Sequence, residues 1–425
     1  MSESTAAATA PTGSLRSGSL KVLAGVSFFG ASTYLFTVVA SRALGPLGFA
    51  EFSVFWGLTY GLGLGVSLPF EQETSRRVSA LMAHGERPGP VLRAALGAAT
   101  VVSLPIVLVL LPVSFALADG GHAWALWAAC STSVGLLAVA YLTRGGLSGT
   151  HHFGSYASQF GIEGVTRLVG AGALAVLGVR SPWAFAFVIP VALALAVVGT
   201  VRMLLRENRV PRPRSSDPVT LRVFLTTLIG MMIATTISMS LVNFGPVAVK
   251  ALTPSGTTSN AGSYLAAALI ARTPIFLFAA VQSVLIPQLV RAVVRRDHAA
   301  FRSTVRRVIV LTAGLGVLGI LGCLALGPEV LRLMSGPSFH LDRTDITLLA
   351  VSTAFILGTL VLQPAAFALE KHWPAVLAWV VAGVSFGVVC LVPGDPVRVV
   401  GSALVVSAAV ATAGLAVVVN RGMRS

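Results

Sequence analysis

The sequence is poor in charged residues, and poorest in acidic ones. Only 11% of its 425 residues are charged and 55% are hydrophobic, whereas about a quarter of the residues in a soluble domain are charged. This excludes a soluble globular protein and indicates an integral membrane protein. The net charge of +15 would indicate a nucleic-acid partner in a soluble protein. Here the basic residues flank apolar spans in short loops, where topology and anionic lipid headgroups account for them, so we expect no nucleic acid.

Cysteine and the motifs of catalysis are scarce as well. Cys130, Cys323 and Cys390 are odd in number, far apart and each inside an apolar run, which argues against a disulfide framework or a metal site. The sequence shows no glycine-rich phosphate loop, no metal-ligand cluster and no nucleophile elbow. No polar stretch is long enough for the nucleotide-binding domain of an ATP-driven pump. We therefore expect no enzyme, no catalytic residues, no cofactor and no metal.

What is abundant is long apolar sequence. Runs of about 20 apolar residues are enough to cross ~30 Å of hydrocarbon, and they predict an all-α integral membrane fold with twelve transmembrane helices. Residues 1–19 are small and polar, and no short apolar run with a cleavage site precedes the first span, so we expect a retained helix rather than a cleaved signal. The predicted spans are Val22–Ser41, Phe52–Phe70, Ala94–Ala118, Ala123–Thr143, Ser155–Val179, Ser181–Val201, Val223–Val249, Ala261–Val290, Val308–Gly327, Ile346–Leu369, Trp373–Val392 and Val399–Asn420.

The basic residues sort onto alternate loops. With the N-terminus inside, 22 of the 30 lysines and arginines fall on inside loops, Arg144 among them, and six fall on outside loops. The remaining two, Arg167 and Arg272, lie within spans. The positive-inside rule therefore favours twelve crossings with both termini cytoplasmic.

The longest polar stretch divides six spans from six. It is rich in proline and in like charges, so it should be an extended linker between two membrane lobes. The expected divisions are a polar cytoplasmic tail at 1–19, an N-terminal six-helix lobe at 20–201, a basic cytoplasmic linker at 202–222, a C-terminal six-helix lobe at 223–420 and a cytoplasmic tail at 421–425.

The two halves also resemble each other. Leu20-Lys21-Val22 opens the first and Leu221-Arg222-Val223 opens the second, and His152-Phe153 after span four matches His372-Trp373 after span ten. Such matches fall in the same order at offsets of 201 to 220 residues. Two lobes in the same orientation imply a pseudo-two-fold axis along the membrane normal, which in transporters places the substrate path between the halves. Chance similarity between two hydrophobic halves is the alternative.

Arg272 is the strongest candidate for substrate binding. It lies in span eight, far from either end, where a charge costs a few kcal/mol. It should therefore face a wet cavity or a partner. A guanidinium is the natural donor to a phosphate because its planar fork forms bidentate hydrogen bonds. An internal ion pair is the alternative.

Glu163 and Arg167 lie four residues apart on span five, so they share a helix face and can neutralise each other. If they instead line the cavity, Glu163 is the candidate site for a coupling ion and Arg167 a second substrate ligand. The remaining substrate-binding candidates are weaker, because an interfacial anchor or an interhelical hydrogen bond also explains them. They are Arg42, Asn243 and Gln282.

Two stretches resemble a known family. In the segment from Ala40 to Phe52, an arginine, a leucine-glycine pair and a glycine-x-phenylalanine turn join the first two spans, as in polysaccharide exporters. The stretch from Ser283 to Arg291 has a proline before a short basic helix, similar to the end of their span eight. With two six-helix lobes, the chain resembles the multidrug/oligosaccharidyl-lipid/polysaccharide (MOP) exporter superfamily, and most closely its O-antigen and capsule repeat-unit flippases.

The resemblance implies alternating access to a cavity between the lobes. The substrate would be an undecaprenyl-pyrophosphate-linked oligosaccharide, crossing the bacterial cytoplasmic membrane, with polysaccharide polymerase and glycosyltransferases as partners besides the phospholipid bilayer. Arg272 occupies the region where related lipid II flippases carry a cavity arginine. However, those relatives usually have fourteen spans, and their other cavity arginines, in the first two spans, have no counterpart here.

Two other functions stay open. A drug/proton antiporter of the multidrug-export type is one, although predicted spans one and two lack the buried carboxylates on which that branch relies. A membrane scaffold in a glycan assembly complex that transports nothing is the other.

Overall fold

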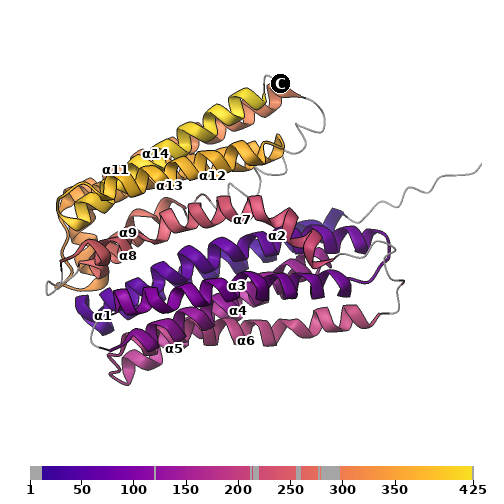
Figure 1. Ribbon diagram of the computed structural model, residues 1–425, viewed down its shortest axis with the longest axis horizontal. Coiled ribbons are helices and arrows are strands. Elements are labelled where there is room, and N and C mark those ends of the chain that lie inside the picture. Colours follow the sequence, from indigo (N-terminus) through magenta and orange to yellow (C-terminus); the bar gives the residue numbers. More distant parts are fainter. Residues whose placement is uncertain are drawn as a thin grey trace, which may run out of the picture.

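The structure is a computed structural model that describes residues 12–118, 121–210, 213, 220–254, 260–275, 278 and 297–423. Within these residues every regular element is a helix (Figure 1). The helices are α1 (Thr12–Leu58), η1 (Thr59–Gly63), α2 (Leu64–Ala83), α3 (Gly89–Leu117), α4 (Ala123–Gly149), α5 (Phe153–Val176), α6 (Pro182–Arg209), α7 (Leu221–Asn243), α8 (Gly245–Leu252), α9 (Ala261–Ala271), α11 (His298–Ser335), α12 (Arg343–Ala368), α13 (His372–Cys390) and α14 (Pro396–Gly422).

The predicted fold class is confirmed. In the described ranges, nine helical stretches are long and apolar enough to cross a membrane. The first of them, Leu20–Ala83, contains two predicted spans, because the backbone breaks at Gly45 (φ 65°, ψ 179°) just before Pro46. Helix α6 continues to Arg209, so the first part of the polar stretch after span six is helical.

Helix packing repeats between the two halves. In the N-terminal lobe (α1 to α6), α1 packs on α5, α2 on α4, α3 on α4, α4 on α6 and α5 on α6. In the C-terminal lobe (α7 to α14), the matching pairs are α7 with α13, α9 with α12, α11 with α12, α12 with α14 and α13 with α14. Figure 1 shows α12 to α14 on one side of the molecule, α3 to α6 on the other and α7 to α9 between them. Two six-helix lobes built on one pattern agree with the expected internal repeat.

The turns after α4 and α12 show the correct register of this repeat. Each turn has a left-handed residue, His151 (φ 59°) and Glu370 (φ 57°). After it, an N–H returns to a carbonyl five positions back, from His152 to Leu147 and from Lys371 to Ala366. A left-handed residue followed by such a bond is typical of a Schellman-type helix end. His152 therefore corresponds to Lys371, and the sequence match of His152 with His372 is wrong by one residue.

Close backbone contacts join the lobes where α1, η1 and α2 meet α7. Gly57, Gly61 and Gly65 lie at intervals of four on one helix face. A Cβ atom at Gly65 would lie 2.5 Å from the Cα atom of Thr236, closer than any side chain tolerates. Thr235 Oγ1 also donates a hydrogen bond of 2.6 Å to the carbonyl of Gly65. The absence of side chains on these glycines lets the two lobes touch through their backbones.

A second set of contacts joins the lobes near Gly45. Arg42 donates to the carbonyls of Met334, at 2.8 Å, and Leu333, at the last turn of α11. Tyr34 Oη lies 2.6 Å from the sulfur of Met334. Phe49 packs edge-on against Phe339, with ring centroids 5.9 Å apart. The lobes are thus held together at the end of the bundle that contains Gly45.

Candidate functional site

A buried network of charged side chains lies inside the N-terminal lobe. Glu163 on α5 accepts a hydrogen bond of 2.5 Å from Arg144 on α4 and a second one from Arg167, one turn further along α5. All three side chains are about 1% exposed or less. The Glu163–Arg167 pair predicted from their spacing is therefore present, but a second arginine shares the carboxylate.

Aromatic rings cover both guanidinium groups. Arg144 lies 4.0 Å from the ring centroid of Phe160, and Arg167 lies 4.7 Å from that of Phe29. Tyr60, in the π-helical turn η1, is also near Arg167. Cation–π contacts of this kind strengthen when they are removed from water, so they help to hold the arginines inside the lobe.

Glu71 and Tyr156 extend the network beyond the residues that the sequence analysis selected. Tyr156 Oη donates a 2.6 Å hydrogen bond to Glu71, which also interacts electrostatically with Arg144. Gln159 Nε2 donates to Thr143 Oγ1 at 3.0 Å. The spacing of Gln159, Glu163 and Arg167, four residues each, places three polar groups on one face of a predicted span, and this signal was present in the sequence.

Polar atoms of this network stay without partners among the described residues. They are the Nε atoms of Arg144 and Arg167 and Oε1 of Gln159. A buried donor or acceptor without a partner costs about 1–3 kcal/mol. The network therefore includes polar atoms that its packing against the described residues does not satisfy.

The matching place in the C-terminal lobe is uncharged. Gln363 on α12 stands 219 positions after Arg144, the same offset as the turns, and it accepts a 3.0 Å hydrogen bond from Trp379 on α13. A neutral contact therefore joins α12 to α13 where an ion pair joins α4 to α5.

Arg272 lies apart from this network, at the C-cap of α9. It is 8% exposed, and it donates a hydrogen bond to the carbonyl of Val242 in the last turn of α7. The negative end of the α7 dipole favours a cation at this place. Among the residues that the structure describes, no acidic side chain pairs with Arg272.

The other sequence candidates are distributed over three places. Asn243 is next to Val242 and bonds to the carbonyl of Met239 in its own helix at 2.9 Å, as an ordinary helix-end side chain does. Arg42 is exposed and binds α11 near Gly45. Gln282 lies outside the described residues. The structure thus brings Glu163 and Arg167 together and places Asn243 near Arg272, but it keeps the two groups in different lobes.

The position of the acids in α2 differs from the sequence expectation. Predicted spans one and two contained no carboxylate, but α2 continues past Phe70 and includes Glu71 and Glu73. Glu73 is buried and accepts hydrogen bonds from Arg76 and Arg77. Within the described ranges, no three His, Cys, Asp or Glu side chains gather as ligands for a metal ion.

Comparisons with known proteins give the fold a family context. No family model matches the chain. One uncharacterized protein of Mycobacterium tuberculosis (strain H37Rv) is 27% identical over 366 residues, which covers 85% of this chain and 82% of that protein. Another from the same strain is 28% identical over 411 residues, covering 91% and 88%.

Solved structures with the same fold are transporters of the MATE family, which belongs to the MOP superfamily. The inward-facing conformation of a multidrug resistance MATE family transporter has a TM-score of 0.68 at 13% identity, covering 92% of this chain and 93% of that one. A mutant of the Vibrio cholerae MATE transporter VcmN has a TM-score of 0.67 at 15% identity, covering 97% and 98%. The chain therefore has the fold of MATE transporters.

Proposed function

We propose that this protein is a membrane exporter that works by alternating access and moves a lipid-linked oligosaccharide across the bacterial cytoplasmic membrane. The proposed cargo is an undecaprenyl-pyrophosphate-linked repeat unit, both termini are cytoplasmic, and a polysaccharide polymerase and glycosyltransferases are the proposed partners. The fold of the MATE transporters and the repeated packing of the two lobes support this mode of transport. We keep 20–201 and 223–420 as the two moving units.

One observation carries the choice of substrate. Arg272 is buried at the C-cap of α9, and its hydrogen-bond partner is a neutral carbonyl, with no acidic partner among the described residues. An uncompensated guanidinium at this depth favours an anion. A pyrophosphate supplies one, and a cationic drug does not.

The position of Arg272 agrees with a path between the lobes. Its acceptor, Val242, precedes Asn243, whose carbonyl would lie 2.9 Å from a Cβ atom at Gly57 in the other lobe. An anion bound at Arg272 would therefore lie close to the contact that has to rearrange during transport. Arg167 is neutralised by Glu163, so we assign it a positioning role.

A drug/proton antiporter is the second candidate, and Glu71 favours it. Predicted span two ended at Phe70, but α2 continues to Ala83 and includes two acidic residues. Glu71 is hydrogen-bonded to Tyr156 and is in no ion pair within the described residues. Glu163, in contrast, is shared by two arginines. If a proton drives transport, Glu71 is the better coupling group.

Transport by purified protein in liposomes tests the proposal. Replacing Arg272 with alanine should reduce translocation of a lipid-linked oligosaccharide about 10- to 100-fold, because a hydrogen bond to a charged group contributes roughly 1.5–3 kcal/mol. The matched control is Arg332→Ala, which removes an exposed arginine from α11 and should leave transport unchanged. Unchanged translocation in Arg272→Ala would contradict the role of this residue.

Two further results would overturn the substrate assignment. Proton-driven export of a cationic dye, lost in Glu71→Gln and kept in Arg272→Ala, would establish the antiporter. Wild-type protein that moves neither substrate would support the scaffold.

A further inference from the structure

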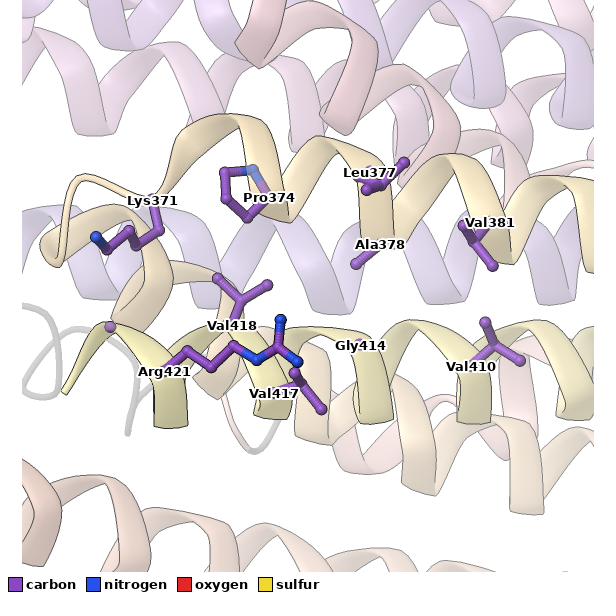
Figure 2. A pocket seen from close by; sticks show the side chains of 11 residues that line it. Lys371, Pro374, Leu377, Ala378, Val381, Val410, Gly414, Val417, Val418 and Arg421 are labelled. Carbon is purple, nitrogen blue, oxygen red and sulfur yellow. The ribbon is translucent and has the colours of Figure 1, made fainter. Parts of the chain in front are cut away.

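A groove lies between α13 and α14 in the C-terminal lobe (Figure 2). Its volume is about 570 Å³, and its wall is apolar over most of its length. Leu377 is 63% and Val381 50% exposed, so the groove opens toward the surrounding membrane. The close approach of Gly414 to Ala378 forms its floor.

Two cations stand at one end of this groove. Lys371 is the N-cap of α13, and Arg421 lies in the last turn of α14 (Figure 2). The turn that ends α12 fixes the backbone of Lys371, and its side chain lies against Gly422. Neither cation forms an ion pair within the described residues. Both lie at helix ends, where the bilayer presents its headgroups.

The start of α13 adds to the positive potential. No side chain caps this helix terminus, so its first N–H groups are without side-chain acceptors. The helix dipole makes the same end attractive to anions and unfavourable for a lysine. Lys371 therefore stands where a bound anion would relieve an unfavourable arrangement.

The N-terminal lobe provides an internal comparison. His152 corresponds to Lys371 in the repeat, and Glu207 lies near the end of α6 as Arg421 does near the end of α14. In that lobe the carboxylate of Glu207 lies 3.9 Å from the imidazole of His152, so an acid stands where α14 has Arg421. In the C-terminal lobe both positions are cationic, and no acidic side chain of the described residues pairs with either of them.

We propose that the groove binds one anionic phospholipid of the membrane. Its phosphate lies between Lys371 and Arg421, and an acyl chain follows Leu377, Val381 and Val410 toward the middle of the bilayer. The site lies on α13 and α14, and Figure 1 shows α7 between these helices and the N-terminal lobe. The assignment requires only that these helices span the membrane, so it is independent of the transported substrate.

Lipid binding by the full-length chain tests this site. The protein is purified in mild detergent, depleted of lipid and titrated with phosphatidylglycerol or phosphatidylcholine of identical acyl chains, and bound lipid is counted by native mass spectrometry. Wild type should bind one phosphatidylglycerol in preference to phosphatidylcholine. In Lys371→Gln/Arg421→Gln the affinity for phosphatidylglycerol should fall about 25-fold, since each cation near the surface contributes about fivefold.

Three further variants make the result specific. Arg421→Glu recreates the pairing of the N-terminal lobe and should abolish the preference for phosphatidylglycerol while the lobe stays folded. Val381→Trp fills the groove but keeps both cations, and should weaken both lipids. The control Arg302→Gln/Arg306→Gln removes two exposed charges from α11 and should bind like wild type.

The proposal is overturned if wild type shows no preference for the anionic lipid. It is equally overturned if Lys371→Gln/Arg421→Gln binds phosphatidylglycerol as wild type does, or if the α11 control loses as much affinity as that variant.

Discussion

Glu163 holds two arginines inside the N-terminal lobe. Each charge was removed from water at a cost of several kcal/mol, and such a pair contributes little net stability compared with apolar packing. Removing one member is different, because the remaining charges stay buried without compensation. The network therefore constrains how α4 and α5 are placed more than it strengthens the fold.

Replacing Glu163 with glutamine should lower stability by about 3–5 kcal/mol, because Arg144 and Arg167 lose their counter-charge. The loss of the folded, monodisperse fraction on heating, followed by size-exclusion chromatography in detergent, measures it. The matched change is Glu329→Gln, since Glu329 pairs with Arg343 but is 55% exposed; its effect should stay within ~1 kcal/mol. Equal melting of the two variants would contradict this account.

At this scale the sequence predicted only part of the site. The Glu163–Arg167 pair follows from helical spacing alone, so it was predictable. Arg144 was assigned to an inside loop because a charge ends an apolar run, yet α4 continues to Gly149 and buries it. The same rule removed Glu71 from span two. Counting apolar residues cannot find a charge whose counter-charge lies on another helix.

Among the elements, α1 contains the sharpest backbone feature. Gly45 has φ 65° and ψ 179° and divides one continuous helical stretch into two spans. This combination of φ and ψ is strongly disfavoured for any residue that has a Cβ atom. No atom lies within 4 Å of where a Cβ would stand, so the requirement for glycine there comes from the backbone alone.

Gly45→Ala should therefore destabilise the protein by about 1–3 kcal/mol. Gly172→Ala is the comparison, because Gly172 lies inside α5 with equally open space around it. That change should stabilise the helix by about 0.5–1 kcal/mol. Melting temperatures of the two variants in the same detergent should move in opposite directions, and a shared direction would refute the role of Gly45.

Most of the spans were predicted from length and apolar composition, which the bilayer sets. Predicted span seven, in contrast, is divided into α7 and α8 at Phe244, and the end of predicted span eight lies outside the described residues. The repeat between the halves was also found, but its register at the turn after span four was wrong by one residue. That alignment was based on the identity of two residues, His152 and His372. The structure aligns backbone shape instead, because the left-handed residue of a helix end is a conformation that His151 and Glu370 share without sequence similarity.

For the whole molecule, the decisive contact is between α1 and the end of α11. Arg42 donates to Met334 and Leu333, and this joins the lobes near Gly45. If the lobes alternate, this contact has to open in every cycle. A covalent link across it should therefore stop transport without unfolding the protein.

In a background lacking the native cysteines, Arg42→Cys with Met334→Cys and a short bifunctional thiol reagent should abolish transport in liposomes. A cleavable reagent followed by reductant should restore it. Glu329→Cys with Arg343→Cys links α11 to α12 within one lobe and should leave transport intact. Full transport by protein cross-linked between Arg42 and Met334 positions would exclude this opening as part of the cycle.

The neutral contact between Gln363 and Trp379 has a consequence for how the two lobes tolerate the loss of one side chain. Without Gln363 an indole N–H loses its acceptor, whereas without Glu163 two buried arginines lose their counter-charge. The first half of this duplicated chain should thus be the more sensitive of the two to a single substitution between its helices.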